Sequence, residues 1–137
     1  MIIFDSTVLI DLFKGNRIAK ALISEVIDSL LSEAVATTTV SYYEVFTGIN
    51  HRNSKKEDAF FRQFFSNIEV LNLDCTAAEE ASKIMAELLR KGWPVKPLDA
   101  LIAGIAKANG ATKIIAGDRH FEYISEVVDF EIVVYNE

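Results

Sequence analysis

Sulfur and imidazole groups are nearly missing from this chain of 137 residues. It holds one cysteine, Cys75, and two histidines, His51 and His120. A single cysteine cannot form an internal disulfide, and the two histidines are too few and too far apart for a Cys/His zinc site. We therefore expect a protein of a reducing, cytoplasmic compartment.

Long apolar runs and linker-like segments are also lacking. No apolar stretch approaches the roughly 18 residues that a membrane-spanning helix needs, and the start, Met-Ile-Ile-Phe-Asp, lacks the basic region of a signal peptide. No segment is repetitive or low in complexity, and 50% of the residues are hydrophobic. We expect one compact, soluble domain over residues 1–137, with no membrane association.

Positive charge is scarce as well. Lysine and arginine number 14 against 20 aspartates and glutamates, which leaves a net charge of -6. This balance argues against a protein that coats nucleic acid through general positive charge. Contact with a polyanion would need local basic residues, each of which taken singly is better explained as solvated surface: Lys14, Arg17, Arg52, Lys55, Lys56, Arg62, Lys96 and Arg119.

Short β-branched runs alternate along the chain with longer stretches of helical period. This alternation is typical of βαβ units and predicts a parallel sheet with helices on its faces. Helical stretches fill the gaps between strands, with the clearest apolar stripe over residues 18–32. The strands are predicted at residues 1–4, 34–38, 68–72, 113–116 and 131–135.

Local signals place several helix ends. Thr76-Ala77-Ala78-Glu79 matches a capping box that opens a helix ending near Gly92. The next helix is predicted to begin at Pro97 or Leu98 and to stop at Asn109-Gly110. Because a glycine inside a helix costs about 1 kcal/mol relative to alanine, Gly104 predicts close packing of this helix on the sheet.

Four phenylalanines crowd one helix predicted over residues 55–67. Phe60, Phe61, Phe64 and Phe65 form two adjacent pairs four residues apart. Two pairs make a wider face than one core stripe requires. The residues leave two alternatives open, a face buried wholly in the core or one whose edge meets a partner.

Four acidic residues stand where the chain changes from one element to the next: Asp5, Glu44, Asp99 and Asp118. In an open parallel sheet the carboxyl ends of strands and the first turns of the following helices converge on one crevice. Carboxylates gathered there would repel one another unless a cation shared them, and oxygen ligands favour Mg2+ or Mn2+.

Each acid also has an ordinary explanation as a helix cap or first-turn charge. Ser41-Tyr42-Tyr43-Glu44 matches a capping box that would occupy Glu44, whereas Ser6 or Thr7 could cap the first helix and free Asp5. The spacing alone therefore leaves a metal site and a set of separate caps as open alternatives.

Read in order, four motifs resemble PIN-domain nucleases, and more narrowly the VapC-type toxins of prokaryotic toxin–antitoxin modules. The resemblance spans nearly the whole chain, and its motifs are specific only in combination. They are Ile3-Phe4-Asp5-Ser6-Thr7-Val8-Leu9-Ile10-Asp11, Ser41-Tyr42-Tyr43-Glu44-Val45 with Gly48, Leu98-Asp99-Ala100-Leu101-Ile102-Ala103, and Ile114-Ile115-Ala116-Gly117-Asp118-Arg119-His120-Phe121.

This resemblance implies a three-layer α/β/α sandwich around a parallel sheet of about five strands. It implies an endoribonuclease, a hydrolase of RNA phosphodiester bonds that depends on Mg2+ or Mn2+, forms homodimers and is inhibited by a small antitoxin. The acidic quartet falls on Asp5, Glu44, Asp99 and Asp118, as catalytic groups and metal ligands. One position departs from the family pattern, since Ala116 stands where a serine or threonine is usual.

Neighbouring residues complete the hypothesis. Ser6, Thr7 and Arg119 could contact the phosphate or hold a ligand, whereas His120 is given no catalytic role.

A non-catalytic PIN-like module that only binds RNA or protein is the main alternative. Enzymes with an aspartyl nucleophile usually repeat the acid two residues after the first, where this chain has Thr7. A response-regulator receiver could use Asp74 but needs an acidic pair where Asp5-Ser6 offers one acid.

Overall fold

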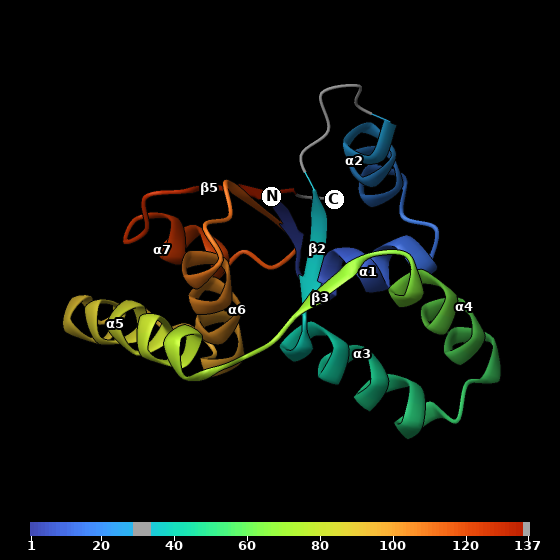
Figure 1. Ribbon diagram of the computed structural model, residues 1–137, viewed down its shortest axis with the longest axis horizontal. Coiled ribbons are helices and arrows are strands. Elements are labelled where there is room, and N and C mark those ends of the chain that lie inside the picture. Colours follow the sequence, from blue (N-terminus) through green and yellow to red (C-terminus); the bar gives the residue numbers. More distant parts are fainter. Residues whose placement is uncertain (29–33, 136–137) are drawn as a thin grey trace.

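A central parallel sheet organises the computed structural model, in which residues 1–28 and 34–135 are described. Its strands stand in the order β3-β2-β1-β4-β5 (Figure 1). Every neighbouring pair is parallel, with Ile3 opposite both Ala36 and Ile114. The five predicted strands are confirmed, with ends shifted by one residue at most: β1 Ile2–Phe4, β2 Val35–Thr38, β3 Glu69–Leu71, β4 Lys113–Ala116 and β5 Glu131–Val134.

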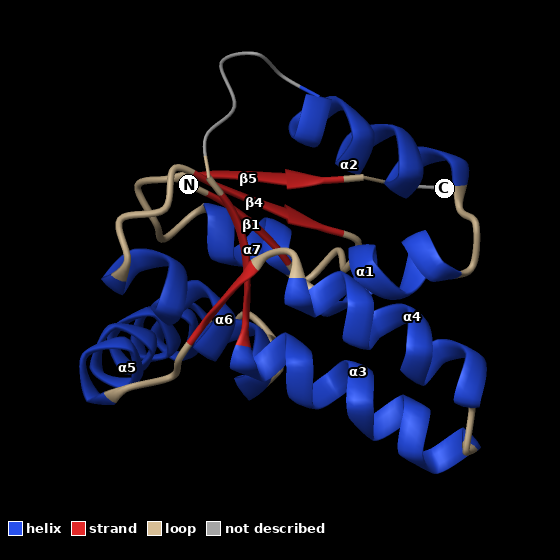
Figure 2. Cartoon of the chain, turned by 45° about the vertical axis from the view of Figure 1, so that its right-hand side comes forward, coloured by secondary structure: helices blue, strands red, loops and turns tan. Residues whose placement is uncertain are grey.

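Helices cover both faces of the sheet, which confirms the three-layer arrangement. One face carries α1 to α4 and the other α5 to α7 (Figures 1 and 2). The last part of the helix predicted over residues 18–32, residues 29–32, lies outside the described residues. The helices are α1 Ser6–Phe13, α2 Arg17–Asp28, α3 Thr39–Arg52, α4 Lys55–Ser66, α5 Cys75–Lys91, α6 Pro97–Ala108 and α7 Phe121–Ser125.

Two hydrophobic cores lie on the two faces of the sheet. Because successive strand residues point to opposite faces, Ile3 joins the core under α5 and α6, whereas Ile2 and Phe4 join the core under α1 to α4. All three residues of β1 are buried. The central strand thus reads as a continuous apolar run, as expected when helices cover both faces.

Two helices begin earlier than their capping-box motifs predict. The cap of α3 is Thr38, whose hydroxyl oxygen accepts the Ser41 amide at 3.0 Å, so Ser41 already lies within the helix. The cap of α5 is Asp74, whose carboxylate accepts the Ala77 amide at 2.8 Å, and not Thr76. In both cases the side chain that caps the helix lies nearer the preceding strand than the residue that the motif names, and it accepts an amide of the first helical turn. The predicted stop at Gly92 is confirmed, with φ at +70°.

Gly104 does mark a close approach, but to α5 and not to the sheet. A Cβ atom at this position would lie 2.4 Å from the Ala81 Cβ and 2.6 Å from the Ala77 carbonyl oxygen. The prediction of close packing is therefore confirmed, and its stated partner was wrong. The backbone contact of α5 with α6 locks the helix that carries Asp99 into the layer.

The phenylalanine-rich helix α4 is buried along one side and open along the other. Phe61 and Phe65 are nearly inaccessible, whereas Phe60 is 36% exposed. Phe60 and Phe64 line an apolar groove of about 720 Å³ together with Ile27, Ala34, Val35 and Ile68. The structure favours a core face with an exposed edge.

No described helix is both long enough and apolar enough to cross a bilayer.

Candidate metal centre

The strand order changes direction at β1, and the predicted acids gather beside this point. From β1 the chain moves outward to β2 and β3, and then returns to add β4 on the other side of β1. The carboxyl ends of β1 and β4 therefore border the crevice where parallel α/β sheets hold their ligands. Asp5 directly follows β1, and Asp118 lies two residues after β4.

Asp5 is fixed by backbone groups at the start of α1. Its side chain is buried, and Oδ1 accepts the Val8 amide at 3.0 Å. Its own amide donates to the Ile115 carbonyl at 3.1 Å, which ties it to β4. Asp5 is thus the cap of α1, and the suggestion that Ser6 or Thr7 would replace it as the cap was wrong. Capping uses one carboxylate oxygen and leaves the second for other contacts.

Asp99 lies in the first turn of α6, where Pro97 occupies one of the first two positions. It is only 6% exposed, and its Oδ2 atom is buried without any hydrogen-bond partner. A buried, unpartnered carboxylate oxygen is costly, so the atom calls for a specific explanation. The helix N-terminus offers partial compensation through its dipole but provides no contact to this oxygen.

Glu44 approaches the crevice from α3. Its Oε1 atom accepts the hydroxyl of Ser6 at 2.9 Å, across a separation of 38 residues. Because α3 begins at Thr39, Glu44 lies in the second turn and does not cap the helix through Ser41. The structure thus gives Ser6 a definite contact, with an acid of the quartet.

Asp118 is surrounded by two groups that sequence reasoning left without a role. Its Oδ1 accepts the His120 amide at 2.9 Å and lies 2.9 Å from His120 Nδ1. Its Oδ2 lies 3.7 Å from Lys96 Nζ. The position of Lys96 three residues before Asp99, at the N-terminus of α6, was the signal that could have placed it here.

The four acids influence one another electrostatically. Burial raises the pKa of Asp5 from 3.8 to about 7, with the Asp99 and Glu44 charges adding to the rise and hydrogen bonds from Val8 and Gly117 opposing it. Burial, followed by the Asp118 and Glu44 charges, raises the pKa of Asp99 to about 6, and Lys96 and His120 oppose this rise. The structure therefore brings the predicted quartet to one end of the sheet.

Asp118 shows the opposite behaviour. Partial burial acts to raise its pKa, but the two hydrogen bonds from His120 and the charges of His120 and Lys96 outweigh it and lower the pKa. The pocket thus contains two acids whose pKa is raised, Asp5 and Asp99, and one whose pKa is lowered, Asp118. Such divergent pKa values among neighbouring acids are characteristic of functional sites.

The family model for the PIN domain matches residues 2–127 of the chain. The chain belongs to the PIN-domain family. Among curated proteins, a tRNA(fMet)-specific endonuclease VapC of Shigella flexneri is 41% identical over 66 residues, which are 48% of this chain and 50% of that protein. The chain spans about half the length of the curated relatives it matches.

Solved structures share the fold of this PIN domain over nearly its full length. DNA-bound VapBC from Salmonella typhimurium superposes with a TM-score of 0.73 at 26% identity, covering 96% of this chain and 95% of that one. VapBC2 from Rickettsia felis, bound to a DNA fragment from its promoter, gives a TM-score of 0.77 at 18% identity, covering 99% and 100%.

The side chains of this PIN domain fit a hard divalent cation. The quartet offers only oxygen ligands, which suit Mg2+ or Mn2+, and Asp99 Oδ2 is an unused acceptor among them. Within residues 1–28 and 34–135, no three carboxylate, imidazole or thiol groups are close enough to hold an ion in their present positions.

Three further residues near the quartet, Thr7, Ala116 and Arg119, lie in different surroundings. Thr7 packs against the loop before Asp118, since a Cβ on Gly117 would lie 2.6 Å from its Cγ2 atom. Ala116, where the family usually has a hydroxyl, is fully buried in the core under α5 and α6. Arg119 is exposed beside Asp118.

Proposed function

We propose that this PIN domain is a Mg2+- or Mn2+-dependent endoribonuclease and the toxin of a toxin–antitoxin pair. The single observation that carries the proposal is the buried Asp99 Oδ2 atom, an acceptor without a donor in a crevice that three further acids enter. The names of the curated relatives, tRNA(fMet)-specific endonucleases, support RNA as the substrate.

The proposed ligands are held by different means. Asp5 is positioned by the Val8 and Gly117 amides, and Asp99 by the first turn of α6. Glu44, steadied by Ser6, and Asp118, steadied by His120, would complete the site or orient a water. A bound Mg2+ or Mn2+ would lower the pKa of the attacking water and offset charge on the phosphate.

Three polar groups beside the quartet are suited to the substrate. Lys96 lies near Asp118 with its side chain 67% exposed, so its ammonium group can turn toward a phosphate. Arg119 is exposed next to it, and Ser6 offers a hydroxyl within reach of the same crevice. Lys96 and Arg119 together supply local positive charge in a chain whose net charge is -6.

Cleavage of a structured RNA tests the activity. We expect cleavage with Mn2+, none after EDTA, and a loss of at least about 100-fold in Asp99→Asn, in line with removing one electrostatic contact to the reacting centre. Asp74→Asn is the matched control, because it exchanges an exposed capping acid for a residue that also caps. Metal binding without cleavage of any RNA would support the non-catalytic alternative, and unchanged cleavage by Asp99→Asn would contradict the proposed site.

A small antitoxin is the proposed protein partner. The solved VapBC structures are toxin–antitoxin complexes by family, and this chain exposes Tyr42 at 37% and Tyr43 at 60%. The Tyr42 ring lies close to the rings of Phe46 and Phe65, at tilted angles, which links this surface to the phenylalanine-rich helix. We propose that an apolar antitoxin helix packs here while a basic side chain enters the acidic crevice. Copurification from a strain that expresses both neighbouring reading frames tests this, and a chain that elutes alone would contradict it.

We also propose a homodimer that works in the cytoplasm. The exposed edge of α4, with Phe60 and the groove beside it, offers apolar surface of the kind that protein contacts use. Light scattering on the purified chain tests the assembly, and a mass of one chain at all concentrations would exclude the dimer.

A further inference from the structure

Three aromatic rings lead away from Asp118 across the surface of the α5–α7 layer. His120 contacts Asp118, the Tyr123 ring lies 6.4 Å from the His120 ring, and the Trp93 ring lies 5.6 Å from the Tyr123 ring. The interplanar angles are 36° and 31°, so neighbouring rings are tilted toward one another. We call Trp93, Tyr123 and His120 the aromatic strip.

The backbone holds Trp93 in a defined place. Gly92 ends α5 in the left-handed conformation, and the Trp93 amide donates to the Leu88 carbonyl at 3.1 Å. This pattern closes the helix end, and the following Pro94 restricts Trp93 to extended backbone. The ring therefore stands on a rigid turn between α5 and α6, and α7 lies beside both helices (Figure 1).

Basic side chains flank the aromatic strip at both ends. Lys91 Nζ lies 5.1 Å above the Trp93 ring, and Lys96 lies near Asp118 at the other end. Lys91 and Arg119 are both exposed. The chain has a net charge of -6, yet here lysine and arginine side chains lie beside an exposed ring, that of Tyr123, and two half-buried rings, those of Trp93 and His120.

We propose that the aromatic strip binds unpaired nucleotides of the RNA substrate beside the scissile phosphate. The inference rests on the proposed nuclease function and adds the place where unpaired bases of the substrate stack. Aromatic rings next to lysines suit unpaired bases, because every base has a face to stack and each phosphate a charge to pair. A duplex hides its base faces and cannot use such a surface.

A protein partner fits the same surface less well. Tyr123 is 36% exposed and its ring neighbours are Trp93 and His120, whereas the groove at Phe60 and Phe64 is lined mainly by apolar side chains, which suits a protein helix better. The contact of His120 with Asp118 makes the aromatic strip continuous with the acidic crevice. A nucleotide next to the cleaved bond would therefore reach the rings first.

Trp93 is the chain's one tryptophan, so its fluorescence reports on the aromatic strip directly. The full-length Asp99→Asn variant in EDTA is titrated with an unstructured RNA of roughly ten nucleotides, a length within the span that single-strand sites cover. We expect base stacking to quench the Trp93 emission. The same sequence annealed into a duplex should leave the emission unchanged.

Tyr123 variants separate stacking from packing. Tyr123→Phe keeps the aromatic face, whereas Tyr123→Leu keeps an apolar side chain beside Trp93 but offers no ring to a base. We expect Tyr123→Leu to weaken binding of a labelled single-stranded RNA about 10-fold, within the range for one stacked base, and Tyr123→Phe to change it less than about 2-fold. In the wild-type enzyme the loss should fall on KM and leave kcat unchanged, which a merely structural defect would not do.

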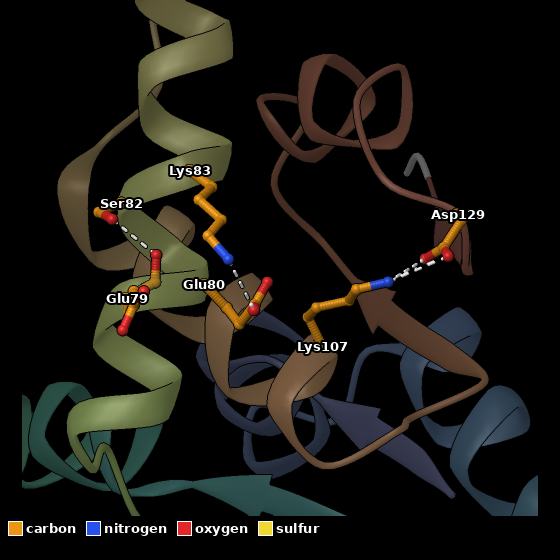
Figure 3. A network of polar contacts seen from close by, with 6 residues as sticks. All are labelled: Glu79, Glu80, Ser82, Lys83, Lys107 and Asp129. Carbon is orange, nitrogen blue, oxygen red and sulfur yellow. Dashed lines mark hydrogen bonds and ion pairs between the residues drawn. The ribbon is translucent and has the colours of Figure 1, made fainter.

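Two lysines on α5 test the charge. Lys91 adjoins the aromatic strip, whereas Lys83 on the same helix pairs with Glu80 at 3.3 Å (Figure 3). We expect Lys91→Gln to reduce the slope of log affinity against log salt by about 0.7, the value for one phosphate contact with a single strand. Lys83→Gln should leave the slope unchanged.

The outcomes distinguish this proposal from the nuclease assignment. Quenching by single-stranded RNA together with the Tyr123→Leu loss supports the aromatic strip, even in a protein that never cleaves. Cleavage by the wild-type protein without quenching keeps the nuclease and overturns the aromatic strip. RNA binding with unchanged Trp93 emission, or quenching by a copurified protein but not by RNA, also overturns it.

Discussion

Replacing Asp5 by asparagine should stabilise the metal-free protein at neutral and basic pH. Asparagine can still accept the Val8 amide as the cap of α1, so the substitution removes the charge and keeps the contact. Burial raises the pKa of Asp5 from 3.8 to about 7. The ionised carboxylate therefore lowers the free energy of unfolding, whereas the neutral amide of the variant would not.

The sign follows from proton linkage. Between pH 3.8 and pH 7 the folded chain keeps the Asp5 proton that the unfolded chain has lost. Stability thus declines as pH rises through this window, because the folded state binds more protons. The difference of about three pKa units corresponds to about 4 kcal/mol over the whole window, and to about 2.5 kcal/mol between pH 5 and pH 8.

Urea denaturation in EDTA at pH 5, 6, 7 and 8 measures this effect. The relevant quantity is the free energy of unfolding of Asp5→Asn minus that of the wild type, because titrating groups that do not interact with Asp5 cancel in the difference. We expect this difference to grow by about 2.5 kcal/mol from pH 5 to pH 8. A difference that stays within about 0.5 kcal/mol would refute the reasoning that burial leaves the Asp5 charge uncompensated.

Two further substitutions test the packing of α5 against α6 and the cap of α3. Gly104→Ala should lower the free energy of unfolding by at least about 2 kcal/mol through overpacking, because the new Cβ would lie 2.4 Å from the Ala81 Cβ. Urea denaturation at pH 7 measures this loss, and a value below about 0.5 kcal/mol would contradict the close contact. Thr38→Ala should cost about 1 to 2 kcal/mol by removing the cap that accepts the Ser41 amide, whereas Thr38→Ser should retain most of it, and equal stabilities of the two variants would exclude the cap.

The parallel sheet with helices on its faces was predictable from the sequence because short, β-branched runs alternate with longer stretches of helical period. Parallel pairing and burial on both faces then follow for a strand such as β1, which is apolar throughout. Asp5 and Asp99 could be placed from the sequence for the same local reason. One follows a buried strand directly, and the other lies just after Pro97, a residue suited to the first helical turn.

Contacts between distant elements could not be predicted. Ser41 to Glu44 is a valid capping box by sequence, yet Thr38 accepts the Ser41 amide that the glutamate would have bound. The glutamate instead accepts the hydroxyl of Ser6, 38 residues away in the chain. Gly104 indicated that another element packs closely against α6, but a glycine inside a helix is equally compatible with packing on the sheet and packing on α5. A sequence motif therefore shows that a residue needs a contact partner, whereas the tertiary packing determines which residue that partner is.

In the acidic crevice, mutually repelling carboxylates lie at the carboxyl ends of the parallel strands. Asp5 and Asp99 are buried next to each other's charge, and Asp99 Oδ2 lacks any donor, although helix N-termini are close by. A divalent cation shared by these oxygens would offset the cost and would bind the folded chain alone, so it would stabilise the fold by mass action. Because protons and the cation compete for the same oxygens, the stabilisation by Mg2+ should increase from pH 5 to pH 8, opposite to the trend in EDTA. Parallel urea titrations of the wild type with and without Mg2+ measure both trends, and a Mg2+ effect of equal size at every pH would place the ion away from Asp5.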